Sequence, residues 1–377
     1  MKLYFNILVL SFLFCSCKND TKKTETLVEE QIELKYSTTF QLYETENYKR
    51  IIVIKPWPDA EKELVYVCAK DKAKIPKNLK YDAFVQLPVQ KIVLTSTTHI
   101  PSLISLNQLE KWVGFPGLDY VSSEAARTKI EAGHVTEIGQ NEALNTEKLL
   151  ELQPDVVVGF AVKGSNKSLN TLSKAGIPVL YNSDWLDEHP LGKAEWIKFF
   201  GVLTNSLPEA EKQFNSIEKN YNDLKKLAAT SGSRPSVLAG AMYKDVWYLP
   251  GGKSWQAQFL KDANTNYVYA DNYETGSLSK SFEAVLNKAQ QTDFWVAPAQ
   301  FTSYQQLLKS SVHYQKFTAF QDKKTYTFAK TKGKKGGVLY YELAPNRPDL
   351  VLQDLVGIFH PELLQVKEFS FFETLDE

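Results

Sequence analysis

Beyond residue 90, short apolar runs alternate with stretches in which apolar residues recur at helical spacing, as Leu103, Leu106 and Leu109 do. Each short run is flanked by polar residues, Gly or Pro, as buried strands usually are. The runs that predict strands are 91–94, 113–115, 156–160, 177–181, 236–240, 294–297 and 326–328. Strands that alternate with helices predict βαβ units, so we expect an α/β fold with largely parallel sheets.

The stretch 191–230 breaks this alternation, because helix-forming residues dominate it and strand signals are missing. Leu207-Pro208 interrupts its helical spacing, which predicts a break or kink and two consecutive helices. We therefore expect an N-terminal lobe at 32–190, a connecting helix at 191–230 and a C-terminal lobe at 231–377. The last lobe is predicted to contain an amphipathic helix at 348–359.

The segment 32–88 precedes this pattern and has the composition of β-strands. The runs 50–54 and 63–67 predict two hairpin strands joined by the loop that contains Pro56-Trp57-Pro58. We interpret this segment as an N-terminal elaboration of the first lobe, of open role.

The first 31 residues have the pattern of an export signal followed by a tether. Met1-Lys2 is a charged start, residues 3–14 are apolar, and Ser16-Cys17 ends the run. A cysteine directly after a small residue predicts a lipoprotein cleaved before Cys17 and lipidated there, with a signal peptide at 1–17. The alternative is a plain signal peptide whose cysteines are incidental. Residues 18–31 are polar and predict a flexible tether to a membrane of the cell envelope, on the periplasmic face or at the cell surface.

Charge and cysteine content exclude several classes of protein. Lysine plus arginine equals aspartate plus glutamate, 44 each in 377 residues, so net charge gives no reason to expect nucleic acid. Cys68 is the one thiol left after removal of Cys15 and lipidation of Cys17, so an internal disulfide is excluded. The chain is long enough for two lobes, each with its own core.

The order of elements resembles the helical-backbone class of periplasmic substrate-binding proteins, which serve ABC importers of ferric siderophores, haem and cobalamin. The matching residues are Lys91-Ile92-Val93-Leu94-Thr95-Ser96, Ile138-Gly139, the run from Asn145 to Val157, and the second-lobe segment from Ser277 to Leu286, which looks like the matching helix start. The resemblance covers roughly residues 91–364 and leaves 32–88 outside it. It implies two Rossmann-like lobes joined by a rigid helix, with the ligand in the cleft between them.

The loops that follow three strands, together with Trp185 after a fourth, are the predicted ligand site, because α/β sheets bind ligands at the carboxyl ends of their strands. Hydroxyls, an imidazole and aromatic rings are available there for a large flat chelate. The predicted residues are Thr95, Ser96, Thr97, Thr98, His99, Phe115, Tyr120, Trp185, Tyr243, Trp247 and Tyr248.

Some of these residues have simpler interpretations. Trp247 and Tyr248 fit a hairpin or the core equally well, and a single histidine such as His99 is more often a loop residue than a metal ligand. If the ligand were haem, His99 or Tyr243 would be the candidate axial ligands. For an anionic siderophore, Arg127 and Arg347 are the arginines in suitable positions.

The resemblance also implies docking on permease subunits of an ABC importer through one carboxylate in each lobe. The matching residues are Glu147 and Glu283, each near the start of a predicted helix. The alternative is that both are ordinary helix-start acids, which favour the helix dipole. We expect a monomer.

Two other functions remain as alternatives. An exported enzyme on the same scaffold would require a nucleophile or acid–base cluster. The five histidines lack metal-site spacing, and Gly251-Gly252-Lys253-Ser254 lacks the full phosphate-loop spacing. An adhesive lipoprotein would predict repeats or β-sandwich spacing. We therefore expect a lipid-anchored solute-binding protein that delivers a metal chelate, with no catalytic residues, no metal site of its own and no cofactor.

Overall fold

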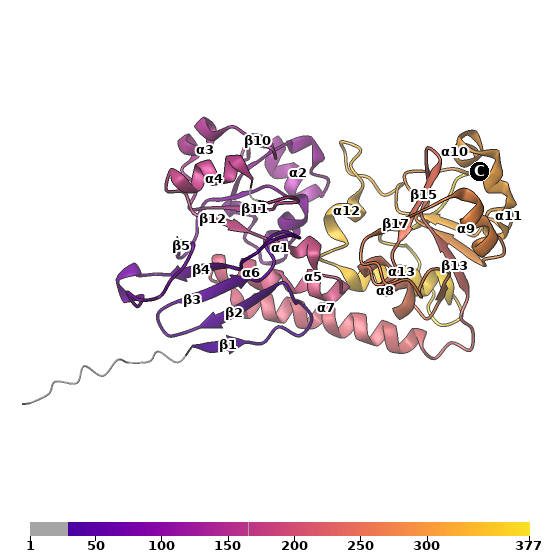
Figure 1. Ribbon diagram of the computed structural model, residues 1–377, viewed down its shortest axis with the longest axis horizontal. Helices are drawn as coiled ribbons and strands as arrows, with labels where there is room; N and C mark the ends of the chain where they lie inside the picture. The colour runs from indigo at the N-terminus through magenta and orange to yellow at the C-terminus, as the bar shows by residue number, and fades with distance from the viewer. Residues whose placement is uncertain (1–28, 165) are drawn as a thin grey trace, which may run out of the picture.

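The computed structural model describes residues 29–164 and 166–377. The predicted signal peptide, Cys17 and residues 18–28 of the predicted tether lie outside the described residues. Figure 1 shows two lobes side by side, with the 22-residue helix α7 (Leu207–Ala228) running beneath both. The predicted fold class, two α/β lobes joined by a long helix, is confirmed.

The central sheet of the N-terminal lobe has five strands, and each neighbouring pair is parallel. In spatial order the strands are β12 (Val179–Tyr181), β11 (Val156–Gly159), β6 (Ile92–Leu94), β7 (Trp112–Phe115) and β8 (Thr136–Glu137). The helices of this lobe are α1 (Ile100–Ser105), α2 (Glu124–Glu131), α3 (Thr146–Leu152) and α4 (Lys167–Lys174). Strands β6 and β11 are buried on both faces, which is why they are continuous apolar runs rather than alternating ones. A short hairpin, β9 (Gly139–Gln140) and β10 (Ala143–Leu144), precedes α3.

The C-terminal lobe has a central sheet of five strands and a smaller antiparallel sheet. The central strands are β16 (Asn266–Tyr267), β13 (Ser236–Ala239), β18 (Phe294–Val296), β19 (Thr325–Thr327) and the antiparallel β20 (Glu373–Thr374). The small sheet contains β14 (Ala241–Tyr243), β15 (Val246–Pro250) and β17 (Ser277–Lys280). The helices are α8 (Trp255–Asp262), α9 (Phe282–Ala289), α10 (Tyr304–Ser310), α11 (Thr318–Gln321), α12 (Leu339–Leu343) and α13 (Pro348–Phe359). The segment expected to be a helix start at Ser277–Leu286 therefore begins as a strand, and α9 starts after the capping residue Ser281.

The connection between the lobes contains three helices. The short helices α5 (Pro190–Glu195) and α6 (Ile197–Leu203) are buried, and α7 starts at Leu207. Helix α5 contacts α8 and α13 of the C-terminal lobe, whereas α6 contacts α1 of the N-terminal lobe, and both contact α7. The break predicted at Leu207-Pro208 is confirmed, because proline fits the first turn of a new helix, where its missing N–H is not needed.

The N-terminal segment forms a separate five-stranded sheet on the first lobe. Its strands are β1 (Glu30–Ile32), β2 (Phe40–Glu44), β3 (Lys49–Val53), β4 (Leu64–Ala69) and β5 (Ala83–Gln86). The predicted hairpin is confirmed as the antiparallel pair β3–β4. The Tyr66 hydroxyl accepts a hydrogen bond at 2.9 Å from the backbone N–H of Tyr181 in β12. The extra sheet therefore packs against β12, the edge strand of the lobe's central sheet. An edge strand left uncovered could pair with another chain, so this cover is favourable.

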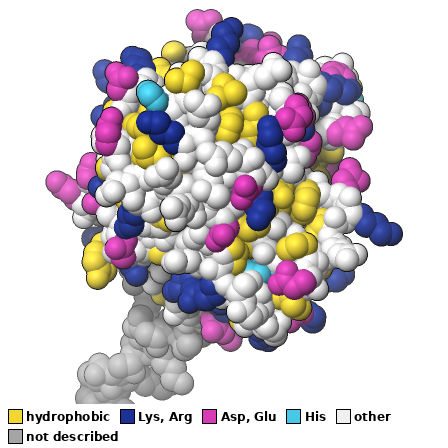
Figure 2. All heavy atoms as spheres, turned by 90° about the vertical axis from the view of Figure 1, so that its right-hand side faces the viewer, with side chains coloured by type: hydrophobic (Ala, Val, Ile, Leu, Met, Phe, Trp, Pro, Cys, Tyr) yellow, Lys and Arg dark blue, Asp and Glu magenta, His cyan; other side chains and the backbone are white. Residues whose placement is uncertain are grey.

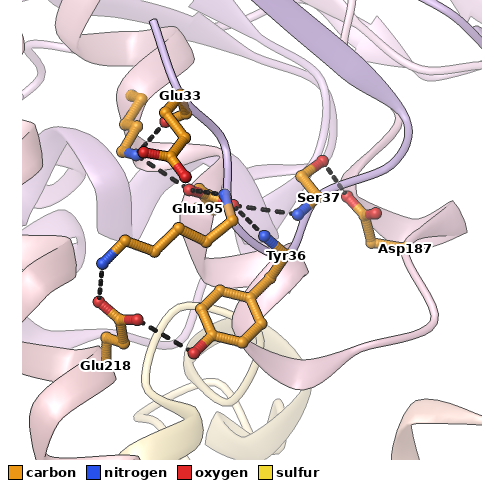
Figure 3. A network of polar contacts seen from close by, with 8 residues as sticks. Glu33, Tyr36, Ser37, Asp187, Glu195 and Glu218 are labelled. Atoms are coloured by element: carbon orange, nitrogen blue, oxygen red, sulfur yellow. Dashed lines mark hydrogen bonds and ion pairs between the residues drawn. The ribbon is translucent and has the colours of Figure 1, made fainter.

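A buried carboxylate fixes the start of this sheet to the helices of the first lobe (Figure 3). Glu195 of α5 accepts hydrogen bonds from the backbone N–H groups of Lys35, Tyr36 and Ser37 at 2.9–3.0 Å. The Lys198 ammonium lies 2.9 Å from the same carboxylate and balances its charge. This pairing lets Glu195 remain fully buried, since an unpaired charge would be costly there.

Two further carboxylates hold the same segment. Asp187 accepts hydrogen bonds from Ser37 Oγ, Thr38 N, Thr39 Oγ1 and Trp196 Nε1. Glu218 of α7 accepts from the Lys35 ammonium at 2.8 Å and from the Tyr36 hydroxyl at 3.0 Å (Figure 3). The extra sheet is thus fixed both to its lobe and to the long helix that joins the two lobes.

Helix α13 differs from the predicted amphipathic helix, because its residues are buried on nearly every side. It packs against α7 and α8, and the C-terminal segment folds back over its remaining face. The buried carboxylate of Asp354 accepts hydrogen bonds from the backbone N–H groups of Ser370, Phe371 and Phe372. These bonds explain how a polar residue is tolerated inside the core.

The molecular surface mixes charges of both signs. Figure 2 shows the end of the molecule formed by the C-terminal lobe, where basic side chains, carboxylates and small apolar patches are interspersed. Within residues 29–164 and 166–377, none of the helices is long and apolar enough to cross a membrane.

Candidate functional site

A segment of the C-terminal lobe crosses to the N-terminal lobe, and we call residues 331–346 the strap. Glu342 of α12 accepts hydrogen bonds from the backbone N–H groups of Ser122 at 2.7 Å and Ser123 at 3.1 Å. Ser123 is the capping residue of α2, so the carboxylate lies at the positive end of that helix. Burial nevertheless raises the pKa of Glu342, and the bonds from Ser122 and Ser123 oppose that rise.

The second attachment of the strap is Asn346. Its side-chain amide donates to the Thr98 carbonyl at 2.8 Å and accepts from the Ser102 hydroxyl at 2.9 Å. Thr98 lies in the 3-10 turn that follows β6, and Ser102 lies in α1. The strap is therefore attached to the first lobe at two places: the start of α2, and the turn and helix that follow β6.

Glycines allow the strap to approach Ser122 closely. A Cβ atom on Gly333 would lie 2.4 Å from the Ser122 carbonyl oxygen, and one on Gly337 would lie 2.3 Å from the Ser122 hydroxyl oxygen. Lys334 and Lys335 pair at the surface with Glu131 and Asp119.

A cavity of about 380 Å³ lies between the first lobe and the strap, and we call it the polar chamber. Its lining includes five of the predicted residues: Thr95, Ser96, Thr97, Phe115 and Tyr120. They converge because β6 and β7 are parallel neighbours whose carboxyl ends meet at one edge of the sheet. Gly337, Val338, Tyr341 and Glu342 of the strap complete the wall.

A larger cavity of about 820 Å³ lies within the C-terminal lobe, at the carboxyl ends of β13 and β18, and we call it the aromatic chamber. The predicted residues Tyr243 and Tyr248 line it, from the two strands of the β14–β15 hairpin. Its other aromatic lining residues are Phe259, Phe301, Phe328, Tyr340, Tyr341 and Phe372. Lys309 is the one cationic residue of the lining, which contains no carboxylate.

Tyr341 lines both chambers and is half exposed. The Gln300 side chain donates a hydrogen bond to its hydroxyl at 3.2 Å. Its ring meets the ring of Phe328 edge-on, with centroids 5.3 Å apart. The strap therefore supplies the wall between the two cavities.

Four predicted site residues do not line either chamber. Thr98 uses its backbone carbonyl to hold Asn346, and Trp185 is partly exposed outside both cavities. His99 is fully buried, and this burial lowers its pKa to about 4. Trp247 is also fully buried and donates its indole N–H to the Ala239 carbonyl at 3.1 Å. The structure thus places His99 and Trp247 in the core.

The two arginines considered for an anionic ligand are already engaged. Arg127 is buried and donates to the Leu118 carbonyl at 2.8 Å. Arg347 forms a two-point pair with Asp349, with both distances 2.9 Å. Neither lines a chamber.

Glu147 and Glu283 occupy equivalent positions in the two lobes. Each is exposed in the first turn of its helix, two residues after a capping side chain. Asn145 caps α3 by accepting from the N–H of Lys148, and Ser281 caps α9 by accepting from the N–H of Ala284. Neither glutamate has an ion-pair partner among the described residues.

Sequence reasoning missed the strap with Tyr341, and it missed Phe328 and Gln300, which contact the Tyr341 side chain. The adjacent aromatic pair Tyr340-Tyr341 after a glycine-rich turn was a visible signal. In the part of the chain that the structure describes, no group of three or more His, Cys, Asp or Glu side chains is placed to hold a metal ion.

Comparisons with known proteins agree with this architecture. The family described as periplasmic binding protein matches residues 92–331. An uncharacterized lipoprotein of Methanocaldococcus jannaschii is 24% identical over 310 residues, which cover 80% of this chain and 72% of that protein. A possible iron-binding (periplasmic solute-binding) protein from Staphylococcus epidermidis has a TM-score of 0.58 at 17% identity, covering 72% of this chain and 99% of that one. A periplasmic heme binding protein from Pseudomonas aeruginosa has a TM-score of 0.57 at 18% identity, covering 77% and 99%.

Proposed function

The chain belongs to the periplasmic binding protein family, and from that premise we propose that it captures a metal chelate and delivers it to an ABC importer. The cargo class is a ferric siderophore, haem or cobalamin. Names of structural neighbours as iron-binding and heme-binding proteins support this class.

The observation that carries the proposal is the pair of chambers that lie at the carboxyl ends of both central sheets. Their lining supplies aromatic rings, hydroxyls and amides, which are groups that hold the organic shell of a chelate rather than a bare ion. Large aromatic side chains bury much apolar area and lose little side-chain entropy when a ligand binds. Because the lining also contains a single cation and no carboxylate, the aromatic chamber suits a bulky ligand of low charge.

Docking on the importer is assigned to Glu147 and Glu283. Both are exposed and unpaired within the described residues, and each lies two residues after its helix cap. Two carboxylates, one on each lobe, would let arginines of a permease subunit engage both lobes at once. Lipidation of Cys17 would hold the protein at a membrane of the cell envelope, on its periplasmic or exterior face.

Native mass spectrometry tests the capture step directly. The purified full chain is mixed with haemin, a set of ferric siderophores and cyanocobalamin in turn. The proposal expects a one-to-one complex with one of these classes that survives gentle desolvation. If all three classes fail to form a complex, the chelate-binding proposal is wrong.

A further inference from the structure

The two chambers differ in chemistry and share one wall. The polar chamber presents the hydroxyls of Thr95, Ser96 and Thr97, whereas rings and aliphatic groups dominate the aromatic chamber. Both chambers are lined by Tyr341. A ligand that occupies both chambers therefore meets this ring.

Tyr341 is held much less firmly than its neighbour Tyr340. The Tyr340 ring is buried and stacks on Phe328 with centroids 4.2 Å apart and an angle of 7° between planes. The Tyr341 ring is 50% exposed, and its hydroxyl is held by Gln300, which is itself exposed. Tyr340 thus anchors α12 in the lobe, and Tyr341 can change rotamer without disturbing that anchor.

The strap that carries Tyr341 has a fixed position. Glu342, the next residue, is attached to the start of α2, and Gly333 and Gly337 lie against Ser122. The backbone is therefore held on both sides of Tyr341, so we expect a bound ligand to displace the side chain of this residue rather than its backbone. The exposed Tyr341 side chain thus stands on a backbone that is held in place.

We propose that Tyr341 is the specificity-determining partition of the site and that the preferred ligand is amphipathic. Resting on the proposed function, this assigns an apolar, ring-bearing body to the aromatic chamber and an uncharged polar end to Thr95, Ser96 and Thr97. The ligand joins the two chambers by displacing the Tyr341 ring. A polyanionic ligand is disfavoured because Arg127 and Arg347 are engaged elsewhere and Lys309 is the one cation that lines the aromatic chamber.

Two fluorescent probes of related chemistry and different length test this partition. Anilinonaphthalene sulfonate is compact and fits one chamber, whereas its dimer bis-ANS is about twice as long and needs both. Each probe is compared only with itself across the variants, so its sulfonate charge does not enter the comparison. Titrations compare the full-length wild type with Tyr341→Ala, Tyr341→Phe and Tyr273→Ala. The last removes an exposed tyrosine that lines neither chamber.

In Tyr341→Ala we expect the affinity for bis-ANS to rise about tenfold, with the affinity for the compact probe changed less than about twofold. Tyr341→Phe, which keeps the ring, and Tyr273→Ala should match the wild type for both probes. Equal changes for both probes in Tyr341→Ala, or no change for either, would overturn the proposal. Thermal unfolding of each variant identifies any that fail to fold, and Tyr341→Leu then replaces Tyr341→Ala with the same expected result. Neither probe is a metal chelate, so a failure here is separate from a failure of the chelate-binding test.

Discussion

The Glu342 carboxylate in the C-terminal lobe accepts a hydrogen bond at 2.7 Å from the backbone N–H of Ser122 in the N-terminal lobe. Together with the bond from Ser123, this attaches one lobe to the capped end of a helix in the other. The contact is buried, and Ser122 and Glu342 line the polar chamber, so the geometry of that chamber depends on it.

Glu342→Gln should loosen this attachment. The amide has one acceptor oxygen, so one of the two N–H groups loses its partner, at a cost of roughly 1–3 kcal/mol for a buried group. Chemical denaturation at neutral pH measures the difference in free energy of unfolding. Glu368→Gln, an exposed change at the C-terminal segment, is the control and should be neutral. Equal stability of wild type and Glu342→Gln would show that the contact does not hold the lobes.

The contribution of Glu342 to the free energy of unfolding should change with pH in a direction that its pKa fixes. Burial raises the pKa of Glu342 in the folded protein, so folding favours its protonated form. Its contribution to stability is therefore largest below the pKa of the unfolded chain and is lost as pH rises through the folded pKa. The stability of the wild type relative to Glu342→Gln should rise as pH falls from 7 to about 4. A difference that stays constant over this range would contradict the assignment.

The fold of each lobe could be predicted from the sequence because its strands are continuous apolar runs. Val156-Val157-Val158 is buried on both faces, and this pattern has few other interpretations. The burial of α13 could not be predicted, because it packs against α7 and α8, which lie much earlier in the chain, while the C-terminal segment with Phe371 and Phe372 covers its remaining face. Local periodicity carries no information on such contacts.

The candidate site was predicted unevenly for the same reason. Thr95 follows β6, Phe115 ends β7 and Tyr120 lies in the turn after it, so sheet topology brings them together. Trp247 points into the core because residues alternate between the two faces of a strand, and its neighbour Tyr248 points to the chamber. Which of the two faces inward depends on packing against Trp295, which lies far away in the sequence.

Glu195→Ala should destabilise the protein strongly. The change leaves the N–H groups at the start of the N-terminal sheet and the Lys198 ammonium without their buried acceptor. Removing one partner of a buried ion pair costs about 3–5 kcal/mol. Guanidinium denaturation compares this variant with Glu218→Ala, whose carboxylate is nearer the surface and should cost less. The account of the N-terminal sheet is wrong if the two variants are equally stable.

Because His99 is buried, we expect the free energy of unfolding to fall in acid. Burial lowers its pKa to about 4, so the folded protein excludes the charged imidazolium that the unfolded chain accepts below its usual pKa of about 6.5. Stability present above the unfolded pKa is therefore lost as pH falls towards 4, by roughly 3 kcal/mol. In His99→Gln, which cannot titrate, this part of the pH dependence should disappear. Unfolding curves of both proteins between pH 7 and 4 measure it, and parallel pH profiles would contradict the prediction.

Glu147→Gln and Glu283→Gln should impair delivery without affecting capture. Loss of one partner of an interfacial ion pair costs roughly 2 kcal/mol, so ligand-stimulated ATPase activity of the reconstituted importer should fall about tenfold or more at limiting binding protein. Glu151→Gln, on the exposed surface of the same helix as Glu147, is the matched control. A parallel fall in ligand affinity would place the glutamates in the binding site instead of the docking surface.

The most direct test of the whole account is a tryptophan-fluorescence titration of the wild type and of Tyr248→Ala with haemin, ferric siderophores and cyanocobalamin. Trp255 stacks near Tyr340, with ring centroids 6.2 Å apart, so a bound chelate lies close enough to quench it. The account predicts saturable one-to-one quenching by one ligand class, weakened about tenfold in Tyr248→Ala because a lining aromatic is lost. If none of the three classes gives saturable quenching, capture of a chelate is contradicted, and equal affinity of the two proteins would contradict a ligand site in the aromatic chamber.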